Sequence, residues 1–161
     1  MRIVVTGAAG FIGARTSTML IEQGHTVVGV DNMNDAYDVR IREFRLRNLQ
    51  KLDGFEFVRD DISDKGILDR KSAITNRKFD AVVNLAARAG VRFSVDNPWV
   101  FLESNTMGTL NMLELCRQTG CPKFLLASTS SIYGANPPYP TPETASSSEP
   151  LQPYAASKKG A

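Results

Sequence analysis

The segment TGAAGFIG, residues 6–13, constrains the fold more than any other part of the sequence. It directly follows a β-branched run, RIVVT at residues 2–6, and it opens a helical pattern that extends from Phe11 to about Gln23. A second strand pattern, HTVVGV at residues 25–30, comes next and ends at an acid, Asp31. A strand, a glycine turn, a helix and a second strand make one βαβ unit, so we expect the chain to begin as a parallel sheet.

The rest of the chain continues this alternation of apolar strand patterns and helical patterns. Three further near-continuous apolar runs predict strands at residues 55–58, 79–85 and 123–128. Helices are predicted at residues 40–51, after a cap at Ser63 or Asp64, from Asn97-Pro98 to about Thr119, and from Gln152 or Pro153 onward. Strands that are apolar throughout indicate a parallel sheet covered on both faces. The predicted class is therefore α/β, most simply a doubly wound sheet with strand order 3-2-1-4-5.

The three glycines of TGAAGFIG suit a turn that wraps around a phosphate. Gly7 permits the tight turn, Gly10 lets the backbone approach a pyrophosphate, and Gly13 allows the helix to pack closely on the sheet. The helix N-terminus adds free amides and the positive end of the helix dipole. Asp31 is placed to accept hydrogen bonds from an adenosine ribose. Its charge would repel a 2′-phosphate and the neighbouring Asn32 carries no positive charge, so we expect NAD rather than NADP.

A second acidic segment, Asp60-Asp61-Ile62, follows the third predicted strand, at the carboxyl edge where ligands of such sheets lie. One interpretation is that Asp61 and Ile62 contact an adenine by hydrogen bonding and packing. The other is that the acids and Ser63 only start the next helix. The sequence leaves both interpretations open.

Hydroxyl groups gather where the fifth predicted strand ends, in the run ASTSSIYG at residues 127–134. Tyr154 and Lys158 follow on the last predicted helix, where residues four apart lie on the same face. Such a set suits oxidation of an alcohol to a carbonyl, in which the tyrosine removes the hydroxyl proton while a nicotinamide takes the hydride. The lysine charge favours the phenolate, and a Ser or Thr hydroxyl bonds the same substrate oxygen.

These segments together resemble the extended short-chain dehydrogenases/reductases, the NAD-dependent epimerase/dehydratase family, and the resemblance covers the whole chain. It rests on TGAAGFIG, Asp31, Asp61-Ile62, NLAARAGVR at residues 84–92, the 105–108 stretch, STSSIYG and YAASK. Within this family, NDAYDVRIREFRL and NLAARAGVRFSVDNP are most similar to UDP-glucuronate 4-epimerases. The resemblance implies a Rossmann-type fold, NAD as cofactor and a UDP-sugar as substrate. The two cysteines have neither metal-type spacing nor partner histidines, so we expect no metal.

The resemblance also implies roles for individual residues. The expected catalytic residues are Thr129 as the hydroxyl, Tyr154 as the acid/base and Lys158 as the residue that tunes it. The residues expected to bind NAD are Gly7, Gly10, Phe11, Ile12, Gly13, Asp31, Asn32, Asp61, Ile62, Leu85, Ala86, Ala87, Tyr154 and Lys158. Those expected to bind the UDP-sugar are Arg88, Gly90, Val91, Arg92, Thr129 and Ser130. Arg92 is a candidate for a substrate anion contact, or else a surface helix-cap charge. Asn105 would be a partner of the active site, or else a helix surface residue.

The residue types at positions 130 and 131 distinguish 4,6-dehydratases from 4-epimerases within this family. Its sugar-nucleotide 4,6-dehydratases carry acidic residues after the catalytic threonine, which remove a C5 proton and protonate the departing C6 hydroxyl. Here both positions are serines, which disfavours a dehydratase and also a decarboxylase of the same arrangement. A 4-epimerase needs only hydride removal, rotation of the 4-keto intermediate and hydride return.

Members of the family are about twice as long as these 161 residues. They continue after the tyrosine–lysine helix with further strands and a smaller domain that holds the nucleotide sugar. We therefore expect residues 1–161 to form an NAD-binding Rossmann domain that lacks the C-terminal substrate domain and has little or no epimerase activity. The alternatives are an NAD-binding module without catalysis, another UDP-sugar epimerase of the UDP-glucose 4-epimerase type, and a fragment that forms a homodimer or pairs through its truncated sheet edge.

Composition and charge exclude several other classes of partner. The net charge is only +2, and the basic cluster at residues 40–51 alternates with apolar residues at helical spacing, so we expect a solvated helix face, no nucleic acid and no membrane. The chain opens directly into a strand and has no apolar run of the roughly 18 residues that span a bilayer, which predicts a cytoplasmic protein without a signal peptide. Cys116, on an apolar helix face, and Cys121, at the start of a strand, are expected to be free thiols.

Overall fold

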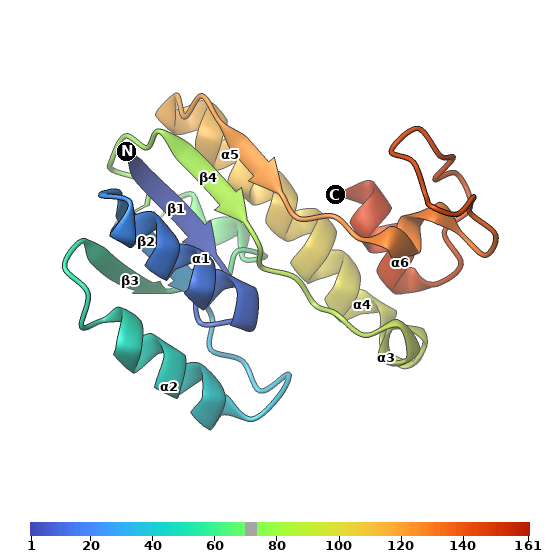
Figure 1. Ribbon diagram of the computed structural model, residues 1–161, viewed down its shortest axis with the longest axis horizontal. Coiled ribbons are helices and arrows are strands. Elements are labelled where there is room, and N and C mark those ends of the chain that lie inside the picture. Colours follow the sequence, from blue (N-terminus) through green and yellow to red (C-terminus); the bar gives the residue numbers. More distant parts are fainter. Residues whose placement is uncertain (70–73) are drawn as a thin grey trace.

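Five parallel strands form the sheet in the order β3-β2-β1-β4-β5, which confirms the predicted order 3-2-1-4-5 (Figure 1). The computed structural model describes residues 1–69 and 74–161. The strands are β1 (Arg2–Thr6), β2 (Thr26–Asp31), β3 (Phe55–Arg59), β4 (Ala81–Asn84) and β5 (Phe124–Leu126). Because neighbouring strands all pair in parallel, the segments that follow their carboxyl ends meet at one edge of the sheet.

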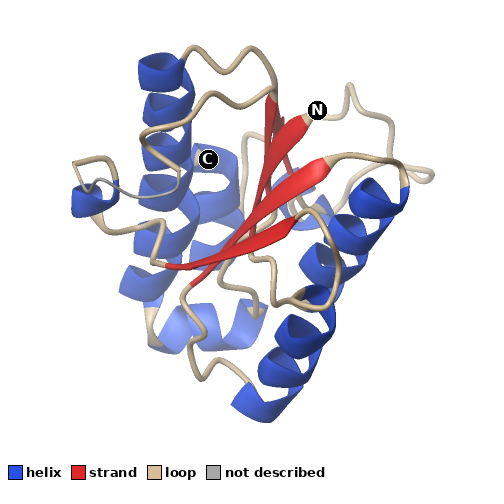
Figure 2. Cartoon of the chain, turned by 90° about the vertical axis from the view of Figure 1, so that its left-hand side faces the viewer, coloured by secondary structure: helices blue, strands red, loops and turns tan. Residues whose placement is uncertain are grey.

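Helices cover both faces of the sheet (Figure 2). The helical segments are α1 (Phe11–Glu22), α2 (Val39–Leu49), η1 (Lys65–Ile67), α3 (Val91–Asp96), α4 (Pro98–Phe101), η2 (Leu102–Met107), α5 (Gly108–Thr119), η3 (Ser130–Tyr133) and α6 (Pro153–Gly160). Helix α1 packs on one face with α2 beside it, and α5 packs on the other face. This is the predicted doubly wound α/β arrangement, a Rossmann-like fold. No helix among the described residues is long and apolar enough to cross a membrane.

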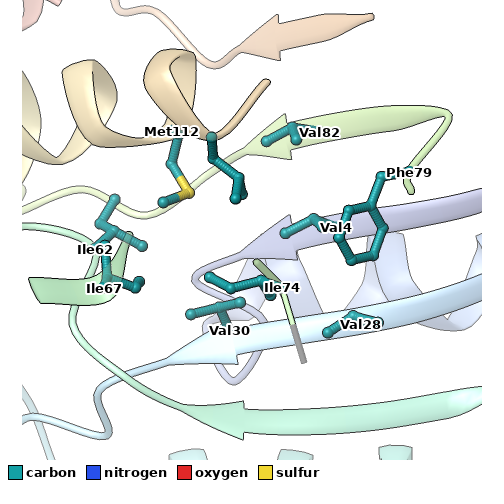
Figure 3. Packing of buried hydrophobic residues seen from close by; sticks show 10 residues of the cluster. Val4, Val28, Val30, Ile62, Ile67, Ile74, Phe79, Val82 and Met112 are labelled. Atoms are coloured by element: carbon teal, nitrogen blue, oxygen red, sulfur yellow. The ribbon is translucent and has the colours of Figure 1, made fainter. Parts of the chain in front are cut away.

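Alternate residues of the central strand β1 enter two separate cores. On the α5 face, Val4 packs with Met112 and Leu115 and with residues of the neighbouring strands (Figure 3). On the α1 face, Ile3 and Val5 pack with residues of α1, β2 and β4. Burial on both faces explains why the strand sequences are apolar throughout instead of alternating with polar residues.

The predicted long helix that begins at Asn97-Pro98 is present, but it is not regular. It consists of α4, the π-helical segment η2 and α5, and Gly120 ends it in a left-handed conformation with φ of 70°. At the end of η2, the Thr109 hydroxyl donates to the Asn105 carbonyl at 2.7 Å. A π-helical turn changes the direction of side chains by only a fraction of a turn, so apolar periodicity does not reveal it, and such turns are frequent at functional sites.

Other predictions of local structure are wrong in part. The helix expected after Ser63 or Asp64 is, up to residue 69, the 3₁₀ turn η1 with Asp64 as its cap, and residues 70–73 lie outside the described residues. Strands β4 and β5 are shorter than predicted, so Cys121 lies before β5 instead of at its start. The short segments α3 and η3 were not expected, because periodicity does not reveal helices of less than two turns.

Cys116 and Cys121 are free, and they meet at the carboxyl end of α5. The Cys121 N–H donates to the Cys116 carbonyl at 2.9 Å across the left-handed Gly120, which is the hydrogen-bond pattern of a Schellman motif. Both side chains pack against the core on the α5 face. Burial, reinforced by the neighbouring Cys121 thiol, raises the pKa of Cys116 to about 12. The raised pKa keeps the Cys116 thiol protonated near neutral pH.

Candidate functional site

The glycine turn after β1 is tight, and side chains would not fit in it. Gly7 has φ of 67°, in the left-handed region, and the Gly10 N–H donates to its carbonyl at 2.9 Å. A Cβ on Gly7 would lie 3.0 Å from the backbone of Ala86, and one on Gly13 would lie 2.0 Å from the Gly7 oxygen. These distances confirm the predicted tight turn at Gly7 and the close helix packing at Gly13.

Asp31 ends β2 and is almost fully buried, at 5% exposure. Its carboxylate accepts the backbone N–H of Ala9 at 3.0 Å and that of Met33 at 2.9 Å, which fastens the glycine turn to the loop after β2. It also forms an ion pair with Arg42 of α2, whose Nη1 lies 3.2 Å from Oδ1. The sequence suggested no positive charge beside Asp31, because the neighbouring residue is the uncharged Asn32. Arg42 brings such a charge from α2, which was not predicted.

Arg42 also corrects the prediction that the basic helix presents only a solvated face. Its side chain is buried, donates to Asn34 Oδ1 at 3.2 Å and stacks on Tyr37, with the guanidinium carbon 4.2 Å from the ring centroid. Its Nε is buried and has no hydrogen-bond partner within the part of the chain that the structure describes. Arg40, two residues earlier, is exposed as predicted and pairs with Asp38.

Arg45, one turn after Arg42 on α2, also contacts the loop after β2. It donates to the Tyr37 hydroxyl at 3.1 Å, and its guanidinium carbon lies 5.5 Å from the centroid of the Phe11 ring. Together with Arg42, these side chains connect the start of α1 to the loop after β2. The sequence held a signal for these contacts of Tyr37, Arg42 and Arg45. The loop and the first turns of α2 follow β2 at the carboxyl edge of the sheet, where ligands of doubly wound sheets bind.

Asp61, after β3, faces Asn32 across the edge of the sheet. Its carboxylate accepts Asn32 Nδ2 at 2.8 Å, the Ser63 N–H at 2.9 Å and the Ser63 hydroxyl at 2.6 Å. Burial by itself would raise the pKa of Asp61, but these hydrogen bonds outweigh burial and hold its pKa below the usual value. The next residue, Ile62, is buried, and its carbonyl accepts Asn111 Nδ2 at 2.7 Å. Asp61 thus starts the turn at Ser63, and the contact of Asp61 and Ile62 with an adenine stays a prediction.

A cavity of about 360 Å³ lies where these segments meet. The predicted cofactor residues that line it are Gly7, Gly10, Phe11, Asp31, Asn32, Asp61, Ile62, Leu85, Ala86 and Ala87. Those outside its lining are Ile12, Gly13, Tyr154 and Lys158. Lining residues that were not predicted are Val30, Asn34, Ala36, Tyr37, Ile41, Arg42, Arg45, Asp60, Ala89 and Ser104. A concave site of this volume, with convergent polar groups among apolar ones, suits a small-molecule ligand or cofactor.

The residues predicted to bind a sugar nucleotide do not all lie together. Arg88 lines the cavity, and its backbone pairs with the Asn105 side chain: the Arg88 N–H donates to Oδ1 at 2.7 Å, and Nδ2 donates to the Arg88 carbonyl at 3.0 Å. Exposed positions at the start of α3, outside the cavity lining, are Gly90, Val91 and Arg92. Asn105 is only 1% exposed, so the alternative of a helix surface position is wrong.

Thr129 and Ser130 lie where the chain leaves β5, at the carboxyl edge of the sheet. The Thr129 hydroxyl accepts the Ser131 N–H at 3.3 Å and so caps η3. It also donates to the Ser131 hydroxyl at 3.3 Å. The predicted cluster of hydroxyls is therefore gathered in one 3₁₀ turn, outside the lining of the 360 Å³ cavity.

Tyr154 and Lys158 lie one turn apart on α6, as predicted. Lys158 is buried, and its Nζ donates at 2.7 Å to the carbonyl of Ala127, two residues before Thr129. This bond brings the lysine to the end of β5, and α6 packs against η3. Burial lowers the pKa of Lys158. The Tyr154 ring packs edge-on against Phe101, with centroids 6.1 Å apart and an interplanar angle of 74°.

A glycine turn after β1, an acid at the end of β2 and a tyrosine–lysine pair on the helix after β5 thus share one edge of a parallel sheet. Residues 4–161 match the family model described as GDP-mannose 4,6 dehydratase. The chain therefore belongs to this family of NAD-dependent epimerases and dehydratases. The resemblance inferred from the motifs is confirmed.

Within that class, the chain is similar to UDP-glucuronate 4-epimerases. It is 50% identical to the UDP-glucuronate 4-epimerase of Thermodesulfobacterium geofontis over 159 residues, which are 98% of this chain and 48% of that protein. It is 43% identical to a probable UDP-glucuronate 4-epimerase of Rhizobium meliloti, over 99% of this chain and 46% of the relative. The crystal structure of the Bacillus cereus UDP-glucuronic acid 4-epimerase in complex with UDP-glucuronic acid and NAD is 30% identical, with a TM-score of 0.78, over 99% of this chain and 49% of the other. The chain spans about half the length of the relatives it matches.

Proposed function

We propose that the chain is the NAD-binding half of a nucleotide-sugar 4-epimerase that interconverts UDP-glucuronate and UDP-galacturonate. The observation that carries the proposal is the bond from Lys158 Nζ to the Ala127 carbonyl. It holds the helix of Tyr154 against the end of β5, close in sequence to Thr129. The three side chains that the chemistry needs therefore belong to the same edge of the sheet as the glycine turn and the cavity.

The residues around the cavity fit a dinucleotide. The backbone is bare at Gly7 and Gly13, where side chains would clash, so a pyrophosphate can approach the turn and the N-terminus of α1. Asp31 would accept a ribose hydroxyl, and Asp61 and Ile62 would contact the adenine. NAD bound there would supply a hydride acceptor for C4 of the sugar and a hydride donor for its return.

Thr129, Tyr154 and Lys158 would handle the proton of the substrate's 4-hydroxyl. The Tyr154 phenol takes this proton as the alcohol is oxidised and returns it when the 4-keto sugar is reduced on its other face. The Lys158 charge, one turn away, favours the phenolate, and its burial strengthens that interaction. The Thr129 hydroxyl bonds the same substrate oxygen and so fixes its position.

UDP-glucuronate is the proposed substrate because the relatives described above carry its name. Its sugar carboxylate needs a cationic partner, for which Arg88 at the cavity and Arg92 on α3 are the candidates. A UDP-glucose 4-epimerase is the alternative within the same chemistry, and its substrate has a neutral hydroxymethyl group in place of the carboxylate. Arg92→Met should therefore weaken binding of UDP-glucuronate more than binding of UDP-glucose.

Dehydration is the second candidate function, because the matching family model is named for a 4,6 dehydratase. That reaction needs a base for the C5 proton and an acid for the C6 hydroxyl, in addition to the hydride step. Ser130 and Ser131 of η3 stand where the dehydratases of this family carry carboxylates. Serine hydroxyls do not serve as that acid–base pair by themselves, which favours the epimerase.

Two measurements test the proposal in turn. Calorimetric titration with NAD, compared with NADP, should give heat and thermal stabilisation with NAD, and the absence of both would contradict the proposal. Incubation with UDP-glucuronate and NAD, followed by chromatographic detection of UDP-galacturonate, tests catalysis. Tyr154→Phe keeps the ring on Phe101 and should remove any product without removing NAD binding. Binding without product would identify these 161 residues as a dinucleotide-binding module.

Self-association and a cytoplasmic location stay predictions. Among the described strands, β5 pairs with β4 alone, and its Leu125 is 55% exposed. An edge of this kind supports a homodimer or pairing with another chain. Sedimentation equilibrium should then give a mass above that of one chain, and a monomer at every concentration would contradict this prediction.

A further inference from the structure

A series of buried hydrogen bonds connects the strand before the glycine turn to helix α6. The Thr6 hydroxyl donates to Asn84 Oδ1 at 2.5 Å, and Asn84 Nδ2 donates to the Thr109 hydroxyl at 3.1 Å. The Thr109 hydroxyl donates to the Asn105 carbonyl at 2.7 Å, and Asn105 Nδ2 donates to the Ser157 hydroxyl at 2.9 Å. None of these five residues is more than 3% exposed. We refer to them as the buried polar network.

At its Thr6 end, the network connects two segments that line the cavity, the turn after β1 and the segment after β4. The Thr6 hydroxyl accepts the Leu85 N–H at 3.1 Å and the Ala86 N–H at 3.0 Å. The Ala86 backbone is also the surface against which Gly7 packs. Leu85, Ala86 and Gly7 all line the cavity, so a ligand that shifts this turn also shifts the partners of Thr6.

At its other end, the network contacts α6 at Ser157, between the candidate catalytic residues Tyr154 and Lys158. The Ser157 hydroxyl donates to the Tyr154 carbonyl at 2.8 Å, and Lys158 is the next residue. The Ser157 carbonyl accepts the Thr106 hydroxyl at 3.0 Å, so η2 holds this serine at both its side chain and its backbone. Helix α6 is eight residues long, too short to be stable by itself, and depends on such contacts for its position.

Asn105 joins the two ends and has no spare hydrogen-bonding capacity on its amide nitrogen. One of its two Nδ2 protons goes to the Arg88 carbonyl and the other to Ser157, while Oδ1 accepts the Arg88 N–H. Arg88 lines the cavity, so it gives a second, shorter path from the cavity to α6. A buried polar network in which every member is paired rigidifies the segments that it joins.

We propose that Ser157 is a positioning residue, which couples occupancy of the dinucleotide cavity to the order of the helix that carries Tyr154 and Lys158. The coupling rests on the proposed function in one respect, that the cavity binds NAD. Serine is a poorer helix former than alanine, and its hydroxyl here accepts Asn105 Nδ2 of the network while it donates to the Tyr154 carbonyl within α6. The bond from Asn105 is the part of this hydroxyl's contacts that an isolated α6 would lack.

Hydrogen exchange of the α6 amides, followed by mass spectrometry with and without NAD, tests the coupling in the chain as it stands. We expect NAD to slow exchange in residues 153–161 of the wild type. In Ser157→Ala, NAD should bind with an affinity within about threefold of the wild type, and α6 exchange should no longer respond to it. If Ser157 only stabilised α6, Ser157→Ala would raise exchange of the α6 amides equally with and without NAD. The difference in exchange between the two conditions would then stay as in the wild type. That result, or a wild-type α6 that does not respond to bound NAD, would overturn the proposal.

Ser17→Ala is a matched control for the loss of a buried hydroxyl. Ser17 lies on α1, is as fully buried as Ser157, and its hydroxyl has no hydrogen-bond partner within the described residues. This variant should keep both NAD affinity and the NAD response of α6. Loss of the response in Ser17→Ala as well would mean that any buried hydroxyl has this effect, which contradicts a specific role for Ser157.

A double-mutant cycle in urea unfolding tests the network without any cofactor. Thr6→Val and Ser157→Ala remove hydroxyls at its two ends, and the midpoint loss of the double variant should be smaller than the sum of the single losses. Ser17→Ala combined with Ser157→Ala should be additive. Additive losses for the Thr6 and Ser157 pair would overturn the coupling. If NAD does not bind but this pair is non-additive, the proposed function fails and the network is retained.

Discussion

Asp31 and Arg42 form a buried ion pair in the lining of the cavity, with Nη1 of the arginine 3.2 Å from Oδ1 of the aspartate. The same carboxylate accepts two backbone N–H groups, from Ala9 and Met33. Most of its acceptor capacity is therefore used before a ligand arrives. A ribose hydroxyl bound at Asp31, as proposed above, would have to share the carboxylate with Arg42, so this pair shapes the proposed site.

Arg42→Met should destabilise the fold strongly, because it leaves the Asp31 carboxylate buried without its cation. Loss of one partner of a buried ion pair costs about 3 kcal/mol or more of unfolding free energy, measurable by urea unfolding at pH 7. Arg40→Met is the matched control on the same helix, since Arg40 forms an exposed ion pair with Asp38 and should change the midpoint little. Equal effects of the two variants would contradict a structural role for the buried pair.

Gly13→Ala should disrupt the glycine turn, because the new Cβ would lie 2.0 Å from the Gly7 oxygen. The turn and the start of α1 have to separate, so we expect NAD affinity to fall at least a hundredfold in calorimetric titration. Gly160→Ala is the control, since its Cβ would meet Thr106 only at ordinary contact distances of 3.4 and 3.5 Å. Helix α6 should tolerate that change without loss of affinity. Wild-type affinity in Gly13→Ala would show that the turn is not part of the cofactor site.

Lys158→Met should change how stability depends on pH. Burial lowers the pKa of Lys158 in the folded chain below its ordinary value of 10.5. Between the lowered value and 10.5, the unfolded state binds more protons than the folded state, so stability rises with pH in that window. Urea midpoints measured from pH 7 to 10.5 should therefore rise more in the wild type than in Lys158→Met. Lys159→Met removes the same charge from the exposed neighbour and controls for net charge; parallel profiles for wild type and Lys158→Met would refute the prediction.

Asp61→Asn should remove part of the acid sensitivity of the fold. Hydrogen bonds from Ser63 and Asn32 hold the pKa of Asp61 below its ordinary value of 3.8, in spite of burial. The stabilisation is complete above the unfolded value and is lost as pH falls through the folded one. Unfolding free energies measured between pH 7 and pH 2.5 should thus decrease less steeply in Asp61→Asn below about pH 4. Asp35→Asn, in the exposed loop after β2, is the control for loss of a carboxylate.

The parallel sheet was predictable because its signals are local. The run RIVVT, the glycine turn and the helix from Phe11 follow one another in the sequence, and five such strand patterns with their crossovers leave few alternatives to the order 3-2-1-4-5. The π-helical turn at Asn105 was not predictable in this way, since apolar periodicity continues through it. The short helix α3 was missed for the related reason that it holds less than two turns.

In the candidate site, too, the local features were predictable and the long-range contacts were not. Gly7, Gly13 and the Tyr154–Lys158 pair follow from spacing along the chain, because turns and i, i+4 pairs are set by neighbouring residues. The ion pair of Asp31 with Arg42 does not follow from spacing, because it depends on how α2 packs beside β2. The expectation of a solvated basic helix was therefore right for Arg40 and wrong for Arg42.

The sequence by itself determined the class of fold, the tight glycine turn and the order in which the candidate catalytic side chains arrive at one edge of the sheet. Each of these depends on residues close together in the chain, whose geometry backbone stereochemistry limits to a few solutions. Only the tertiary structure decided which distant groups meet, such as Asn105 with Ser157 or Lys158 with the Ala127 carbonyl. Buried polar groups take whatever partner the packing brings within reach, and packing is a property of the whole fold and not of any one segment.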